Sequence, residues 1–82
     1  NMDSGMIGKI EKAKRYAEER DRVEFQTFSA TFDGANNPHT VYFKDGDWQC
    51  DCSYFQTRGW CSHTRALEII LNGMLPEPVN ES

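Results

Sequence analysis

Apolar residues recur with a helical period at the start of this chain. Between Met6 and about Arg20 they fall on one narrow stripe, which predicts an amphipathic helix. The stripe consists of Met6, Ile7, Ile10, Ala13 and Ala17. Asp3 or Ser4 is a suitable cap for the first turn. The small side chains of Ala13 and Ala17 indicate that another element packs closely against this stripe.

A second helical pattern lies near the C-terminal end. The residues expected on its buried face are His63, Ala66, Leu67, Ile70, Leu71 and Met74, which follow the spacing of one helix face. Ser62 is the predicted N-cap, and Gly73 and Pro76 are stop signals. The positions expected to face solvent are Arg65, Glu68 and Asn72.

The segment between the two helices is predicted to form a sheet. Residues 23–33 are rich in β-branched and aromatic side chains, which favours a strand. Apolar side chains first fall on odd-numbered positions (Val23, Phe25) and then on even-numbered ones (Phe28, Ala30, Phe32), which predicts either a bulge near Gln26-Thr27 or a strand covered on both faces. A turn at 34–38 leads into a second strand, and Asp45-Gly46 is a two-residue hairpin signal.

This hairpin would pair Phe43 with Trp48 and Val41 with Cys50. We therefore expect an α+β fold with an N-terminal helix, a three-stranded antiparallel sheet connected in order, and a C-terminal helix. The hairpin and the second helix would form a ββα finger, with its core at 41–71 and a short loop between them.

Length and composition predict one small domain. Residues 6–75 form it, residues 1–5 are interpreted as a tag remnant and a flexible start, and the Pro-rich acidic tail 76–82 is expected to be disordered. A chain of 82 residues buries only about 60% of its unfolded surface, so it needs extra stabilisation. It has no apolar run of the roughly 18 residues that a membrane span requires, which predicts a soluble protein.

The three cysteines and one histidine supply that stabilisation if they bind zinc. Cys50 and Cys52 are followed, after eight residues, by Cys61 and His63. Cys3His is a complete tetrahedral ligand set for one structural Zn²⁺. In a strand, residues two apart share a face about 6.6 Å apart, so Cys50 and Cys52 can aim their sulfurs at one point. The third thiolate and the imidazole would come from the start of the second helix.

Two alternatives to this site follow from the same residues. The hairpin register places His39 opposite Cys52, so His39 is a rival for the fourth ligand. We favour His63, because Cys-x-His at a helix start is preorganised whereas His39 follows a loose turn. The cysteines could instead be buried thiols or form a disulfide with one left over. Their odd number and the lack of a secretory leader argue against a disulfide-stapled domain and predict a reducing, cytoplasmic location.

The pattern Cys-x-Cys, spacer, Cys-x-His on a hairpin and a helix start resembles the SWIM zinc finger. The resemblance covers Val41 to Leu71 in its ββα context and implies that Cys50, Cys52, Cys61 and His63 are the zinc ligands. It also implies binding to DNA or to proteins, because such fingers occur beside helicase, transposase or ubiquitin-ligase-like domains.

Net charge bears on the choice between these partners. The net charge of -4 becomes about -5 once three thiolates and one Zn²⁺ are counted, which argues against autonomous, tight binding to duplex DNA.

The loop 53–60 combines three aromatics with one arginine, and these could stack on unpaired bases or anchor a peptide. Alternatively, Phe55 and Trp60 cover the zinc and fill the core. The candidate partner-binding residues are Arg58, Tyr54 and Arg65 with Lys9, Lys12 and Arg15 of the first helix, although the basic residues of that helix also fit a solvated face.

We expect a binding module rather than an enzyme. A catalytic zinc keeps one open coordination position, whereas this ligand set is filled by the protein. Arg65 stands where the zinc deaminase signature requires a glutamate. The sequence therefore predicts a zinc module that binds nucleic acid, with DNA favoured. The alternative is a protein-interaction adaptor without DNA binding of its own, and neither a membrane nor a small-molecule substrate is expected.

Overall fold

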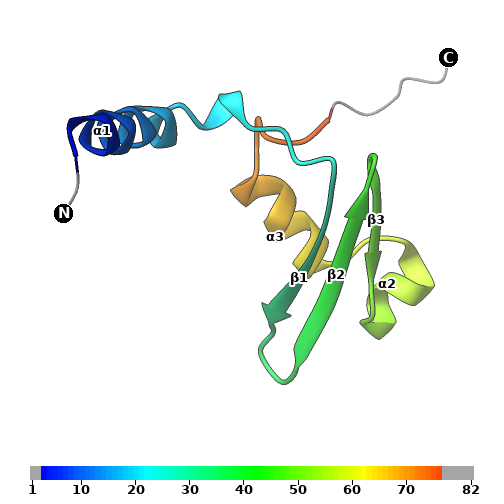
Figure 1. The fold of residues 1–82 in the computed structure, drawn as a ribbon. Coiled ribbons are helices and arrows are strands. Elements are labelled where there is room, and N and C mark those ends of the chain that lie inside the picture. The colour runs from blue at the N-terminus through cyan, green and yellow to red at the C-terminus, as the bar shows by residue number, and fades with distance from the viewer. Residues whose placement is uncertain (1–2, 77–82) are drawn as a thin grey trace, which may run out of the picture.

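The computed structural model describes residues 3–76 (Figure 1). The elements are α1 (Ser4–Glu18), the 3₁₀ helix η1 (Arg20–Arg22), β1 (Thr27–Asp33), β2 (Pro38–Lys44), β3 (Asp47–Cys50), α2 (Ser53–Arg58) and α3 (Ser62–Ile70). This order confirms the predicted α+β fold, with one helix more than predicted after the sheet. Residues 1–2 of the predicted flexible start and residues 77–82 of the predicted tail lie outside the described residues.

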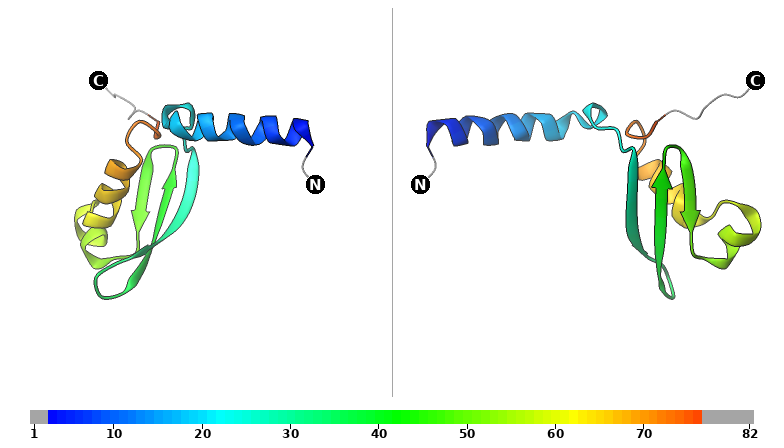
Figure 2. Two further views of the ribbon diagram at one scale, coloured as in Figure 1. Left: turned by 90° about the vertical axis from the view of Figure 1, so that its left-hand side faces the viewer. Right: turned by 45° about the vertical axis from the view of Figure 1, so that its right-hand side comes forward.

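Helix α1 forms an arm that leaves the rest of the fold (Figure 2). Asp3 caps it, since its carboxylate accepts a hydrogen bond from the backbone N–H of Met6 at 2.8 Å. The helix begins at Ser4, two residues before the predicted start, and Gly5 lies in its first turn rather than in a flexible segment. None of residues 4–18, all of them described, is buried. The predicted close packing on Ala13 and Ala17 is therefore not made by residues 3–76.

The three strands form an antiparallel sheet in the order β1-β2-β3, as predicted. Phe43 pairs with Trp48 and Val41 with Cys50, which confirms the predicted hairpin register. Asp45 and Gly46 both have positive φ, 49° and 95°, as a type I′ turn requires. Helices α2 and α3 lie on the same side of the sheet (Figure 2). Tyr42 belongs to the opposite face, because its neighbours in the strand point toward the buried side.

The first strand is shorter than predicted. It starts at Thr27, and the residues before it form η1 and an extended link. The backbone N–H of Phe25 donates to the carbonyl of Met74 at 2.8 Å, so this link pairs with the segment after α3 instead of extending the sheet. The change of parity near Gln26 marks the beginning of the strand, and the predictions of a bulge or of a strand from residue 23 were wrong.

Two helices, rather than a loop and one helix, follow the hairpin. The sulfur of Cys52 accepts the N–H of Phe55 at 3.4 Å, which caps α2, and Gly59 ends it. Cys61, not the predicted Ser62, caps α3. Helix α3 ends at Ile70, whose side chain is exposed although the pattern placed it on the buried face.

The core is small, and three of its residues are the cysteines. Cys50, Cys52 and Cys61 are buried together with Val41 and Phe55. Phe32, Trp48 and Leu67 pack against this cluster. Across the described residues, every helix is too short or too polar to cross a membrane.

Because Phe55 is the large side chain with which α2 enters the core, Phe55→Ala should lower the free energy of unfolding by about 3 kcal/mol. Chemical denaturation with zinc present measures this. Tyr54→Ala is the control, since Tyr54 is exposed on the same helix and should cost less than about 1 kcal/mol. Equal losses in both variants would show that α2 does not contribute to the core.

Candidate metal centre

The hairpin positions the first two sulfurs. Cys50 is the last residue of β3 and is fixed by its pairing with Val41. The backbone N–H of Asp51 donates to the carbonyl of Thr40 at 3.3 Å, which keeps the chain beside β2 up to Cys52. The side-chain amide of Gln56 in α2 donates to the carbonyl of Cys50 at 2.8 Å. The end of β3 and the start of α2 are thus held together at the point where both thiols lie.

Cys52 and Cys61 each cap a helix with their sulfur. The N–H of Phe55 approaches the Cys52 sulfur at 3.4 Å, and the N–H of Thr64 approaches the Cys61 sulfur at 3.5 Å. Thr64 also accepts a hydrogen bond from the N–H of Cys61 at 3.2 Å, completing a capping box. Backbone donors at a helix start stabilise a thiolate, so the two caps suit metal-binding sulfurs.

His63 lies on the first turn of α3 and brings its Nδ1 atom to the thiols. This nitrogen is 3.7 Å from the sulfur of Cys50 and 3.7 Å from that of Cys61. The imidazole packs against two rings from the sheet, with centroid distances of 5.0 Å to Phe32 and 4.5 Å to His39. These contacts orient the ring so that Nδ1, rather than Nε2, faces the sulfurs.

His39 occupies a different place. Its Nδ1 lies 2.8 Å from a carboxylate oxygen of Asp51, and this hydrogen bond lowers the pKa of the Asp51 carboxyl. Among the described residues, the group of potential donors contains His63 and not His39. His39 therefore supports the ring of His63 from outside the cluster.

The four donor atoms fit one zinc ion. Cys50, Cys52, Cys61 and His63 each offer one atom, and these atoms lie within 4.8 Å of one another. In a tetrahedral site with bonds of about 2.0–2.3 Å, neighbouring donors are roughly 3.5–3.8 Å apart, close to the 3.7 Å observed between His63 and two of the sulfurs. The three thiols are free and buried. A bound Zn²⁺ would join the hairpin to both helices as a structural crosslink.

The charge state of the thiols also calls for a cation. Burial raises the pKa of Cys50 well above its usual range, and the neighbouring Cys52 and Cys61 thiols raise it further. Burial opposes ionisation of Cys61 as well, but hydrogen bonds with the backbone and side chain of Thr64, together with those to the Cys52 and Cys50 side chains, outweigh this and lower the pKa of Cys61. Metal binding requires deprotonated thiols, and a divalent cation at this place would supply the compensating charge.

The fold and this donor set define a structural zinc-binding module. Residues 39–72 match the family model of the SWIM zinc finger, and all four donors lie inside the match. Residues 39–72 therefore form a SWIM zinc finger whose four donors suit one structural zinc, as the resemblance implied. Comparisons with curated proteins and with solved structures gave no match.

The predicted partner-binding residues do not form one surface. Tyr54 and Arg58 lie together on α2, with the guanidinium 5.4 Å from the centre of the tyrosine ring. Arg65 lies on α3 and pairs with Glu68 at 3.4 Å. The other three, Lys9, Lys12 and Arg15, are on the arm. The structure therefore separates a group beside the metal centre from a group on α1.

Some residues of the site were missed or misjudged from the sequence. Trp60 was expected to help fill the core, yet it is half exposed and packs edge-on against Tyr54, whereas Phe55 is buried as expected. Gly34 was predicted only as part of a turn. A Cβ atom there would lie 2.8 Å from the carbonyl of Asn37 and 3.3 Å from Nε2 of His63. A glycine in a turn carries no sequence signal for this approach to a ligand ring.

His63→Ala should abolish stoichiometric zinc binding and folding, because it removes one of the four donors. His39→Ala should keep one zinc per chain and the fold, because His39 only packs against His63. Elemental analysis of protein purified without chelator, with circular dichroism on the same samples, measures both. Loss of zinc from His39→Ala alone would identify His39 as the ligand.

Gly34→Ala should weaken zinc binding, since the added methyl must displace the Asn37 carbonyl and crowds the rings of His39 and His63. We expect a stability loss of about 1–3 kcal/mol, typical of overpacking, and a matching drop in zinc affinity measured by chelator competition. Gly8→Ala in α1 is the control, because a Cβ there meets nothing within 4 Å. An unchanged affinity for Gly34→Ala would show that the turn can move away without disturbing His63.

Proposed function

We propose that the finger binds single-stranded nucleic acid, with DNA as the favoured form, through an aromatic shelf formed by Tyr54, Trp60 and Arg58. The observation that supports this most is the exposure of both rings beside the metal centre: Tyr54 is 46% and Trp60 50% exposed. Large aromatic side chains normally bury most of their surface. Two such rings side by side on the surface suit a planar ligand.

The geometry of the shelf fits unpaired bases. The rings of Tyr54 and Trp60 meet edge to face with their centroids 5.4 Å apart, and about half of each side chain stays exposed to contact a base. Base stacking on an aromatic side chain contributes about 1–3 kcal/mol per base. Arg58 lies over the Tyr54 ring at 5.4 Å and can pair with a phosphate from there.

Charge favours a single strand over a duplex. The chain carries a net charge of -4 before the thiolates and the metal are counted, and a duplex binder normally needs a strong basic field. Stacking requires less positive charge, because each base contributes through its ring. Lys9, Lys12 and Arg15 on the arm would contact only a strand long enough to reach from α2 to α1. Arg65 would contribute less than Arg58, since Glu68 partly neutralises it.

A second candidate function is docking of a protein segment at the same place. It is supported by an open cavity of about 430 Å³ that lies between the shelf and the metal centre. The cavity is lined by His39, Cys52, Ser53, Tyr54, Trp60, Cys61, Ser62 and His63. An apolar side chain of a partner could insert there, and the acidic chain would not oppose such a contact. The partner could belong to the helicase- or transposase-like machinery that the family resemblance implies.

Fluorescence anisotropy with oligothymidine and with duplex DNA, at low and moderate salt, tests the proposal. Affinity for the single strand should be higher and should fall as salt rises. Tyr54→Ala should weaken binding about 5- to 150-fold, the equivalent of one lost stacking contact. Arg58→Ala should reduce the salt slope by about one phosphate contact.

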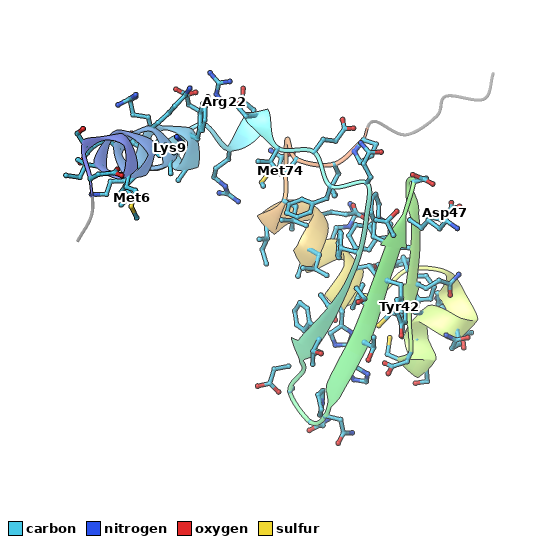
Figure 3. The ribbon with its side chains drawn as sticks, in the orientation of Figure 1. Met6, Lys9, Arg22, Tyr42, Asp47 and Met74 are labelled. Carbon is cyan, nitrogen blue, oxygen red and sulfur yellow. The ribbon has the colours of Figure 1, made fainter. Side chains whose placement is uncertain are left out.

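Tyr42→Ala provides the matched control, because Tyr42 is an exposed tyrosine on the opposite face of the sheet (Figure 3). It should bind like the parent protein. Equal affinities for the parent and Tyr54→Ala would contradict the proposal. Absence of any DNA binding by the zinc-loaded protein would leave protein docking as the better account of the shelf.

A further inference from the structure

The arm exposes an apolar face that nothing in the described chain buries. Met6 is 48%, Ile7 50% and Ile10 39% exposed, and the side chains of α1 stand clear of the finger (Figure 3). A single helix of 15 residues is only marginally stable in water, because nucleation is costly and most helical stability comes from packing. An uncovered helix with such a face therefore implies a partner.

We propose that this partner is a second copy of the chain, with the two α1 helices packed antiparallel. The contact would be a seam formed by Met6, Ile10, Ala13 and Ala17, which are spaced by four, three and four residues. This is the alternation of a and d positions in a heptad repeat, where such residues pack as knobs into holes. Helix α1 thus carries one continuous seam from its first turn to its last.

The sizes of the seam residues are complementary only when the helices run in opposite directions. The N-terminal half contributes the large side chains of Met6 and Ile10, and the C-terminal half contributes Ala13 and Ala17. An antiparallel pair places Met6 against Ala17 of the second copy and Ile10 against its Ala13. Each layer then combines one large and one small side chain, which fills the interface evenly. A parallel pair would place large against large at one end and leave gaps at the other.

The charges beside the seam favour the same direction. Lys9 and Lys14 occupy the g and e positions, which face each other in a parallel pair and would repel. In an antiparallel pair, g positions face g positions and e positions face e positions, so Lys9 and Lys14 no longer face each other, and Lys14 lies within reach of Glu11 of the second copy. The positive N-terminus of each helix also lies beside the negative C-terminus of the other.

The size of the contact predicts a dimer that depends on concentration. A helix of 15 residues is about 22 Å long, so the seam alone falls short of the roughly 800 Å² per partner of a standard interface. Further apolar surface lies at the root of the arm, meaning the junction between α1 and the finger, where Val23 and Ile70 are exposed. Arg20 fixes this root by donating to the carbonyl of Ile70 at 2.9 Å. In the antiparallel dimer, Met6 and Ile7 of one copy end near the root of the other.

Sedimentation analysis of the zinc-loaded protein over a wide range of concentrations tests the dimer. The average mass should rise from 9.5 kDa toward twice that value. Ile10→Lys should remain at the monomer mass throughout while keeping its zinc, because the seam and the finger are separate. Gly8→Lys adds the same charge on the outer side of α1 and should dimerise like the parent. A parent protein that stays monomeric, or an Ile10→Lys variant that dimerises equally well, would overturn the proposal.

Disulfide crosslinking tests the direction of the helices. The double variant Met6→Cys with Ala17→Cys should form a covalent dimer on mild oxidation of the zinc-loaded protein. Each single variant should not, because the two copies of either position lie about 16 Å apart along an antiparallel pair. The parent protein under the same oxidation controls for the thiols of the finger. Crosslinking by Met6→Cys alone would show a parallel pair and refute the antiparallel seam.

Discussion

The finger depends on the convergence of three thiol sulfurs and one imidazole nitrogen in its interior. Cys50, Cys52 and Cys61 are among the few buried residues of the described chain, so three of the four groups that would bind the metal are also part of the core. A chain of this length buries a smaller fraction of its surface than a larger domain and is correspondingly marginal in stability. Metal binding and folding are therefore two aspects of one event, and each ligand is positioned by an element that the metal in turn stabilises.

The sequence predicted the part of the fold that short-range patterns determine. Asp45-Gly46 fixes the register of the hairpin through its positive φ angles, and this register brings Cys50 to the end of β3. The spacing of the cysteines and His63 then identified the four donors. These features depend on a few residues each, and tertiary contacts do not override them.

What the sequence did not predict depends on tertiary contacts or on unusual uses of side chains. Cysteine is not a common helix cap, so the start of α2 at Cys52 was missed and the start of α3 was assigned to Ser62. The hydrogen bond between Phe25 and Met74 joins residues far apart in the chain, and it shortens β1. The apolar face of α1 was correctly recognised, but the pattern could not show that the described part of the chain leaves it uncovered.

Cys52 and Cys61 are both metal ligands and helix caps. This limits how much the length of the spacer between the two ligand pairs can vary. Helix α2 and a short link occupy the spacer, so one ligand pair lies directly before α2 and the other lies shortly after it. Inserting one residue into α2 would rotate everything after it by about 100° and carry Cys61 and His63 away from Cys50. Length changes would be tolerated only in the Gly59-Trp60 link or by adding whole helical turns. In fingers built this way, the number of residues between the two pairs should therefore cluster at preferred lengths.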